Sequence, residues 1–435
     1  MKIFLVAGEA SGDLHASHVV KALRAAKLPD NQDLELVGWG GDRMQAAGMR
    51  LLSHYKDRAF MGLVEVIKNI RTVMGFLSQA KEDILREQPD MLLLIDNPGF
   101  NLRLAEFAKH RGIPVHYYIA PKAWAWNEGR IKTMRKCIDA LYVIFPFEVA
   151  YFESRGMPCT YVGNPIFDEI DEVVERFHEN RGWDVELETL VESGTLVESE
   201  TLFQSKSVKD RIDSKIILLM PGSRKNEVSS LLPVFIQSAR KYDTSARCLV
   251  AGAPGLTADF YQEVLLRAVE QKAISKADAD SVQVVFGATY SMLMQLGDGA
   301  LIAPIRRKTM GRGLALVASG TATLETALLG VPQVVAYRLN AISYWFARKL
   351  VKLKWVSLVN ILLNRGLVVE HLQEVTPDRL VGSMQQLDAN YNPANFEKVQ
   401  AGYRELREQL KNSDGSSASV NLANLLLGVR KIERI

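Results

Sequence analysis

Four short polar stretches carry the residue types that bind phosphates and move protons. They are "GEASGD" (8–13), "DNPGFN" (96–101), "PGSRKNE" (221–227) and "SGTATLE" (319–325), and each directly follows an apolar run. A turn between a strand and a helix favours Gly, Ser and Asp in any case, so one such stretch alone is weak support for a site. Two in each half of the chain indicate a site for a polar ligand.

The stretch "SGTATLE" suits a diphosphate. The start of a helix offers unpaired N–H groups and the positive end of the helix dipole, and Ser319, Gly320 and Thr321 add hydroxyl donors without bulk. Glu325 lies about one turn further on, where a carboxylate could accept both hydroxyls of a ribose. The alternative is purely local: Ser319 is an N-cap and Glu325 a favourable charge in the first helical turn.

A second phosphate contact is expected from Arg224, because a guanidinium binds two oxygens at once. The pattern GxxxxGK[ST] is absent, and the glycines of 38–48 lack the spacing GxGxxG. A P-loop and a dinucleotide site of the oxidoreductase kind are therefore disfavoured.

A proton acceptor is expected at Asp96, which ends a fully apolar run. Partial loss of hydration raises the pKa of such a carboxylate and favours proton acceptance. Glu9 could do similar work, and the alternative for Asp96 is to cap a helix that begins near Asn101. His15 and His18 could share a helix face, but no third ligand is evident, so no metal site is expected.

The elements that position these residues follow one rhythm. Short runs that are apolar on both faces alternate with amphipathic stretches, which predicts an α/β fold with parallel sheets covered on both sides. Ligands of such sheets bind at the carboxyl ends of the strands, where the four polar stretches fall. The expected strands include 2–7, 91–95, 114–119, 140–145, 215–220, 247–252, 282–287 and 332–337. Near the end of this series, "ALIA" (300–303) and "LALV" (314–317) compete for one place, and "LALV" is preferred.

The rhythm restarts after residue 213, which predicts two Rossmann-like, doubly wound domains facing a cleft. The segment between them contains the hexad "TLVESG-TLVESE-TLFQSK" (189–206), interpreted as a surface insertion that is poorly ordered or a loose hairpin. The predicted domains are 1–170, a linker at 171–213, 214–390, and C-terminal helices at 391–435.

Composition narrows the class of protein. The chain has 435 residues, too many for one core, and a net charge of +3, too small to imply nucleic acid. No run approaches the ~20 apolar residues of a membrane span. Three cysteines without CxxC spacing fit a reducing cytoplasm. The stretches 61–81 and 342–363 combine apolar faces with Lys, Arg and, in the second, Trp, which together favour a peripheral membrane protein over ordinary core helices.

Eight motifs occur in the order found in one enzyme family: "LVAGEASGDLHAS", "MGLVEV", "IDNPGFN", "PKAWAW", "PGSRKNEV", "SGTATLETAL", "PQVVAYR" and "SLVNIL". Over about 1–170 and 215–375 the chain resembles the lipid-A-disaccharide synthases. The resemblance implies the GT-B fold and an inverting transfer of 2,3-diacylglucosamine from UDP to 2,3-diacylglucosamine 1-phosphate in lipid A biosynthesis. It implies that no metal or other cofactor takes part. It also implies a cytoplasmic location on the inner face of the cytoplasmic membrane, and it is compatible with a homodimer.

The resemblance also assigns roles to residues. Asp96 would be the base, while Arg224 with Ser223 would hold the diphosphate beside Ser319, Gly320 and Thr321, and Glu325 would hold the ribose. The acceptor side and other polar positions would comprise Glu9, Ser11, Asn101, Asn360, Glu370 and Gln373.

Three features depart from the family pattern: the hexad repeat, "GNP" at 163–165 in place of "GHP", and a basic insertion at 304–313 that abuts the phosphate site. Two other hypotheses therefore stay open. One is a UDP-sugar epimerase of the same fold, and the other is a non-catalytic protein that binds a nucleotide sugar or a membrane.

Overall fold

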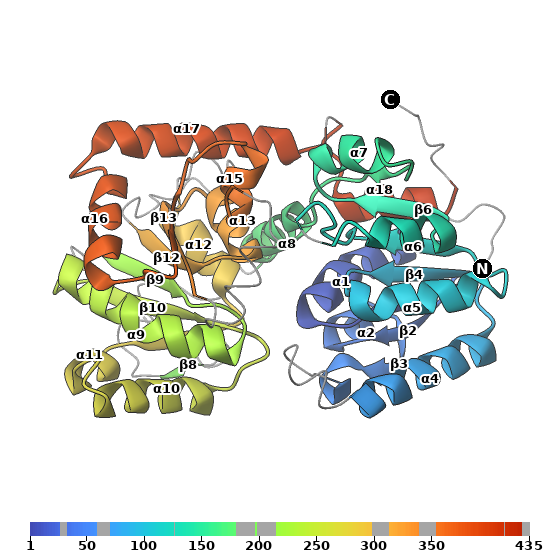
Figure 1. Ribbon diagram of the computed structural model, residues 1–435, viewed down its shortest axis with the longest axis horizontal. Helices are drawn as coiled ribbons and strands as arrows, with labels where there is room; N and C mark the ends of the chain where they lie inside the picture. Colours follow the sequence, from blue (N-terminus) through green and yellow to red (C-terminus); the bar gives the residue numbers. More distant parts are fainter. Residues whose placement is uncertain are drawn as a thin grey trace. The chain divides into compact units, whose positions relative to one another are not determined.

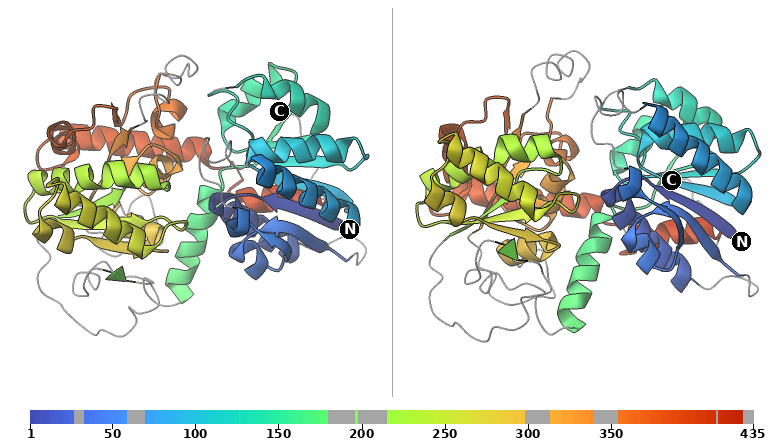
Figure 2. Two further views of the ribbon diagram at one scale, coloured as in Figure 1. Left: turned by 60° about the horizontal axis from the view of Figure 1, so that its bottom comes forward. Right: turned by 90° about the horizontal axis from the view of Figure 1, so that it is seen from below.

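The computed structural model describes most of the chain as two compact units (Figures 1 and 2). The first unit comprises Met1–Asp168 with Leu410–Ile435, and the second comprises Glu169–Gln409. The residues that the structure describes are 1–26, 33–58, 70–125, 127–179, 196–197, 215–297, 313–338, 354–412 and 414–428.

The first unit is built on a seven-stranded, all-parallel sheet with the order β3-β2-β1-β4-β5-β6-β7. This doubly wound order places β1 and β4 side by side at its centre, so the loops that follow these strands share one edge. The strands are β1 Lys2–Ala7, β2 Glu35–Gly40, β3 Arg50–His54, β4 Met91–Ile95, β5 Val115–Tyr118, β6 Ala140–Val143 and β7 Thr160–Tyr161.

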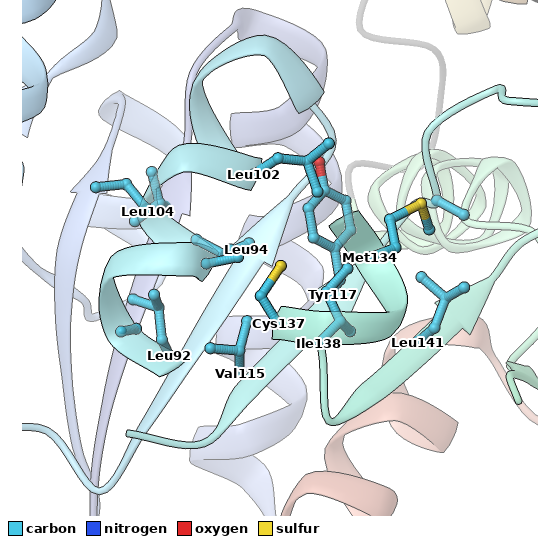
Figure 3. Close-up of a cluster of buried hydrophobic side chains, with 14 of the residues drawn as sticks. Leu92, Leu94, Leu102, Leu104, Val115, Tyr117, Met134, Cys137, Ile138 and Leu141 are labelled. Carbon is cyan, nitrogen blue, oxygen red and sulfur yellow. The ribbon is translucent and has the colours of Figure 1, made fainter. Parts of the chain in front are cut away.

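Successive residues of a strand point to opposite faces of the sheet, and the central strands are apolar on both faces. Helices therefore cover both faces of this sheet. Phe4 and Val6 belong to a core cluster with residues of α4, α5 and α6, part of which is drawn in Figure 3. Ile3 and Leu5 belong to a second cluster with α1 and α18. The helices are α1 Ala10–Ala25, α2 Asp42–Ala46, α4 Ile70–Glu87, α5 Pro98–Lys109, α6 Arg130–Cys137, α7 Pro146–Glu153 and α18 Ala418–Leu426, with the 3-10 turn η2 at Tyr55–Arg58. Helix α8, Ile166–Glu179, begins in the first unit and continues into the second.

The second unit repeats this plan with the strand order β14-β13-β12-β9-β10-β11-β8, again all parallel. Its strands are β8 Leu196–Val197, β9 Ile216–Met220, β10 Arg247–Gly252, β11 Gln283–Phe286, β12 Leu314–Ala318, β13 Gln333–Tyr337 and β14 Val369–Leu372. Its helices are α9 Lys225–Tyr242, α10 Ala258–Glu270, α11 Lys276–Asp280, α12 Thr289–Leu296, α13 Thr321–Leu328, α15 Leu358–Leu362, α16 Pro377–Leu387 and α17 Pro393–Leu410.

The predicted α/β fold with two doubly wound, parallel sheets is confirmed, and so is the choice of "LALV", which forms β12. Strand β2 was not predicted, because its two glycines are unusual in strands. The packing of β2 against β1 explains the glycine at position 38, because a Cβ there would lie 2.0 Å from the carbonyl oxygen of Leu5 on β1. Of the hexad repeat, only Leu196 and Val197 are described, and they form the edge strand β8 beside β11.

The end of the chain returns to the first unit. Helix α18 packs against α1, and the Asp168 carboxylate accepts the backbone N–H groups of Ala418 and Ser419, both at 3.0 Å. This contact satisfies free N–H groups at the start of α18. Among the described residues, no helix is long and apolar enough to cross a membrane.

Candidate active site

Asp96 lies at the carboxyl end of β4 in a strained turn. Its φ is 47°, that of Asn97 is 42°, and that of Ile119 at the end of the neighbouring β5 is 62°. A positive φ is unusual for any residue with a Cβ and a clear outlier for a β-branched one, and such strain concentrates at functional sites. The N–H of Asp96 donates to the carbonyl of Tyr118 at 3.0 Å, which ties the turn to β5.

Two side chains, Asn101 and Tyr117, donate hydrogen bonds to the backbone oxygen of Asp96. Asn101 Nδ2 donates to it at 2.8 Å and also to the carbonyl of Ile95 at 3.0 Å, and the Tyr117 hydroxyl donates to it as well. Asn101 is completely buried. The structure thus places Asn101 beneath the turn, as a support for Asp96, and α5 already begins at Pro98, with Asn97 rather than Asp96 at its N-cap.

The charges around the Asp96 carboxyl act in both directions. Burial raises its pKa above the ordinary value, and the Glu9 carboxylate adds to this rise, whereas Lys122 and Arg130 oppose it. A carboxylate whose pKa is raised binds a proton more readily. The environment of Asp96 therefore suits the proton acceptor that the sequence predicts.

The turn after β1 meets the turn after β4. A Cβ added to Gly8 would lie 2.0 Å from Asn97 Nδ2, so a larger residue at this position would displace the Asn97 side chain. Glu9 and Ser11 are exposed at the start of α1. Asp13 turns inward instead, where its carboxylate accepts the N–H groups of Gly41, Arg43 and Met44 at the start of α2, at 2.8 to 3.1 Å.

A buried carboxylate close to this site, Glu148, was not predicted from the sequence. Glu148 is 1% exposed and accepts hydrogen bonds from Trp124 Nε1 at 3.0 Å and from the N–H groups of Ile144 and Phe145 at 3.2 and 3.1 Å. Burial raises its pKa to about 7, while these donors and Lys122 oppose the rise. The local signal was "FPFE", with Pro at the first helical position and Glu two residues later, a pattern typical of a capped helix start.

In the second unit, Ser223 and Arg224 follow β9 in a turn held by Glu227. The N–H groups of Ser223 and Arg224 donate to Glu227 Oε2 at 3.2 and 3.4 Å, and Arg224 Nη1 lies 3.2 Å from Glu227 Oε1. Gly222 has a φ of 111°, and a Cβ there would lie 2.5 Å from the same carboxylate. The Arg224 side chain is 66% exposed, so its guanidinium still faces solvent and can bind an anion.

The helix α13 begins without a side-chain cap. Gly320 is its N-cap, and Ser319 instead donates its hydroxyl to the carbonyl of Val356 at 2.9 Å. The local alternative, in which Ser319 caps the helix, is therefore wrong, because tertiary contact with Val356 takes the hydroxyl away. Among the described residues, no atom lies within 4 Å of a Cβ placed on Gly320, and Thr321 is exposed, so this part of the structure leaves the start of α13 uncovered.

Asn360 and Glu370 hold the segment that Ser319 contacts. Glu370 on β14 accepts the N–H groups of Val356 and Ser357 at 2.9 and 3.0 Å and Asn360 Nδ2 at 2.8 Å. Asn360 Oδ1 accepts the N–H groups of residues 367 and 368, and its Nδ2 also donates to the carbonyl of residue 368. Both side chains thus fix the backbone beside Ser319.

Gln373 follows β14 with a φ of 64°, and its N–H donates to the carbonyl of Tyr337 at 2.9 Å. Tyr337 ends β13, where burial and Glu227 raise its pKa and Arg224 opposes the rise. Gln373 and Arg224 therefore follow strands whose carboxyl ends share one edge of the sheet.

Glu325 lies one turn into α13 and is partly buried. Burial raises its pKa to about 7, the nearby Glu169 adds to the rise, and a hydrogen bond with Tyr290 opposes it. Its partners thus come from α12 and α8. The ribose contact of Glu325 stays a prediction.

Parts of three predicted stretches lie outside the described residues: 61–69 of the stretch 61–81, 342–353 of the stretch 342–363, and 304–312 of the basic insertion 304–313. The first unit thus gathers Glu9, Asp96, Lys122 and Glu148 at one sheet edge, and the second gathers Arg224, Ser319 and Gln373 at the equivalent edge. In a GT-B fold these edges are where ligands of the two domains bind.

Solved structures that are similar to the chain support the fold. A UDP-GlcNAc 2-epimerase from Neisseria meningitidis, solved with UDP-GlcNAc, aligns with a TM-score of 0.59 at 13% identity, over 94% of this chain and 99% of that one. The glycotransferase of kitacinnamycin aligns with a TM-score of 0.55 at 14% identity, over 98% of this chain and 97% of that one.

Sequence relatives are more specific. Lipid-A-disaccharide synthase from Trichlorobacter lovleyi is 33% identical over 98% of this chain and 97% of its own length, and the one from Myxococcus xanthus is 32% identical over 94% and 93%. The family model of lipid-A-disaccharide synthetase matches residues 3–186 and 189–424. The chain, with its GT-B fold and its two polar sheet edges, belongs to the lipid-A-disaccharide synthetase family.

Proposed function

We propose that this protein transfers 2,3-diacylglucosamine from UDP to the 6-hydroxyl of 2,3-diacylglucosamine 1-phosphate, which yields UDP and a β-1,6-linked disaccharide phosphate, the lipid A precursor. The observation that carries the proposal is Asp96, a partly buried carboxylate with a raised pKa in a strained turn, in a chain of this family. The epimerase alternative is not favoured, because the epimerases share the fold at low identity only.

On the donor side, Arg224 and the uncapped start of α13 bind the diphosphate. The exposed guanidinium supplies two donors, and the helix start supplies N–H groups and the hydroxyl of Thr321. These groups stabilise the negative charge that develops on the departing UDP. We propose that no metal or other cofactor takes part, since the donors of the chain itself can supply this stabilisation.

On the acceptor side, Asp96 accepts the proton of the 6-hydroxyl as its oxygen attacks the anomeric carbon. The bond from that carbon to UDP breaks in the same displacement, so an α-linked donor gives a β-linked product without a covalent intermediate. The side chains that hold the Asp96 backbone, Asn101 and Tyr117, keep the turn fixed during this step.

Because both substrates carry acyl chains, we propose that the protein works on the inner face of the cytoplasmic membrane. In the described part of the stretch 61–81, Leu77 is buried in the core, as in an ordinary core helix, and Met74 on α4 is the large apolar side chain left exposed to meet a membrane surface. In the described part of the stretch 342–363, Lys354 lies over the ring of Trp355 at 4.6 Å, a basic and aromatic pair typical of interfacial segments.

The test uses the purified full chain with both lipid substrates in mixed micelles. Release of UDP and a disaccharide phosphate, identified by mass spectrometry, is the expected result, and it should persist in EDTA. Interconversion of the UDP-sugar without acceptor would support the epimerase instead, and binding without turnover would support a non-catalytic role. Asp96→Asn should abolish transfer while UDP still binds, because the amide cannot accept the proton.

A further inference from the structure

The motif "PQVVAYR" ends at Arg338, and the proposed reaction gives this arginine no role. Arg338 directly follows β13, the strand between β12 and β14. The backbone at the end of β13 already joins two parts of the donor side. The carbonyl of Ala336 accepts the N–H of Ser319 at 3.1 Å. The carbonyl of Tyr337 accepts the N–H of Gln373 at 2.9 Å. Arg338 therefore leaves the sheet at the point where these two segments meet.

The Arg338 side chain connects α9 to the segment that follows β14. Its Nη1 donates to the carbonyl of Ser230 on α9 at 3.0 Å, and its Nη2 donates to the carbonyl of Val375. Val375 is buried and lies two residues beyond Gln373. One guanidinium thus links two backbone segments, which its planar fork of donors allows.

This bridge keeps a positive charge in a half-buried place. Burial lowers the pKa of the Arg338 guanidinium, and among the described residues no carboxylate forms an ion pair with it. Backbone carbonyls are its partners instead. A partly desolvated charge without an ion-pair partner is costly, so the bridge is better explained by the segments that it fixes than by a gain in stability.

The part of α9 that Arg338 holds is the part that follows the phosphate-binding turn. Glu227, in the first turn of α9, accepts the N–H of Arg224 at 3.4 Å and its Nη1 at 3.2 Å. Ser230 in turn donates its hydroxyl to the carbonyl of Glu227 at 3.1 Å. Pro233 has no N–H to donate, so α9 lacks one intrahelical hydrogen bond directly after these residues. The first turns of α9 therefore need support from outside the helix, and Arg338 supplies it.

We propose, on the basis of the donor site proposed above, that Arg338 is a positioning residue for UDP, whose guanidinium fixes the start of α9, and with it Arg224, against the segment that carries Gln373. Arg338 acts through Arg224 rather than on the diphosphate, since both of its Nη atoms donate to backbone carbonyls. Without this bridge the start of α9 can shift, and Arg224 no longer meets the diphosphate in the same place.

The decisive experiment is a double-mutant cycle of Arg338→Met and Arg224→Ala in the full chain, measured by isothermal titration with UDP. Arg338→Met alone should raise the Kd of UDP about tenfold, which is part of the loss expected for Arg224→Ala. In the Arg224→Ala background the same change should alter the Kd by less than about twofold, because a residue that acts through Arg224 has no effect once Arg224 is gone. Additive losses would overturn the proposal, since Arg338 would then contribute independently of Arg224.

Arg240→Met is the matched control for a loss of stability. Arg240 lies on the same helix, and its Nη1 donates to the carbonyls of Thr244 and Ala246 beyond the far end of α9. Thermal unfolding followed by circular dichroism should show a lower Tm for this variant, as for Arg338→Met, while its Kd for UDP should equal that of the wild type. If both variants bind UDP equally weakly, the effect of Arg338 is a general loss of stability and the positioning role is wrong.

Arg338→Lys separates the fork of donors from the charge, since lysine keeps the charge at one point and lacks the planar donors. We expect this variant to bind UDP more weakly than the wild type. Wild-type affinity would mean that the charge alone matters, which contradicts the bridge. Should Arg338→Met fail to fold, the same cycle with Arg338→Lys decides the question.

Calorimetry with UDP needs no acceptor, so this proposal and the proposed reaction fail in different ways. If the wild-type protein binds UDP but makes no disaccharide, the proposed reaction is wrong, and the cycle still decides the role of Arg338. If the wild-type protein does not bind UDP, both are wrong.

Discussion

Replacing Glu370 by Gln should destabilise the second unit, because the Glu370 carboxylate receives three hydrogen bonds and has no unused oxygen. Oε1 accepts the N–H of Ser357 and Nδ2 of Asn360, and Oε2 accepts the N–H of Val356, all within 3.0 Å. A glutamine that keeps its oxygen in the place of Oε1 puts an NH2 group against the Val356 N–H. One hydrogen bond is lost and two donors face each other.

The magnitude follows from these contacts. Leaving a buried donor without a partner costs about 1–3 kcal/mol, and the Val356 N–H is partly buried. The two remaining hydrogen bonds also weaken, because their acceptor is no longer charged. We expect the free energy of unfolding to fall by about 2–3 kcal/mol in total. The Val356 carbonyl also accepts the hydroxyl of Ser319 at the start of α13. Because the Glu370→Gln change loosens Val356, it should also disturb Ser319, and UDP should bind more weakly.

Urea unfolding followed by circular dichroism measures the first effect, and isothermal titration with UDP measures the second. The matched control is Glu374→Gln, which removes the same charge from an ion pair with Arg379 in which the glutamate side chain is 71% exposed. An exposed pair of this kind contributes about 0–1 kcal/mol. If Glu370→Gln unfolds and binds UDP like Glu374→Gln, the hydrogen-bond argument for the support of Ser319 is wrong.

Two further predictions concern the proposed donor side. Arg224→Ala should weaken UDP binding by roughly 1.5–3 kcal/mol, the range for a hydrogen bond to a charged group. Lys241→Ala, at the other end of α9, is the control and should bind UDP like the wild type. If calorimetry gives the two variants equal affinities for UDP, Arg224 does not bind the diphosphate. Glu325 has a folded-state pKa raised from 4.5 to about 7, so the folded protein holds this proton more tightly than the unfolded chain, and stability falls as pH rises from about 4.5 to about 7. Glu325→Gln should lose less stability than the wild type across this window in urea unfolding, and parallel curves would contradict the raised pKa.

Local pattern was enough to locate the strands that carry the site. The runs 2–7 and 91–95 form β1 and β4 with the predicted bounds, because a central parallel strand is buried on both faces and needs apolar residues at every position. The position of Asp96 at the end of β4 follows directly. The edge strands β3 and β14 were missed because their residues are only partly buried and their pattern is correspondingly weak.

The supports of the site could not be predicted from local pattern. Trp124 and Glu148 are 24 residues apart, and the Ser319 hydroxyl finds its acceptor 37 residues further along the chain. Ser319 shows the consequence most clearly, since its local context favours an N-cap and its tertiary contact prevents it. Hydrogen bonds of this kind depend on how the loops fold over the sheet edge, which residue types and spacing do not encode locally.

The sequence by itself determined the fold class, the family and the stretches that hold the chemistry, because buried parallel strands and the turns after them leave a local record in residue type. Only the tertiary structure decided which side chains hold those stretches. It placed Asn101 beneath Asp96, Glu148 behind Trp124 and Glu370 beside Ser319, because a buried polar group must find its partner wherever the packed chain brings one within reach.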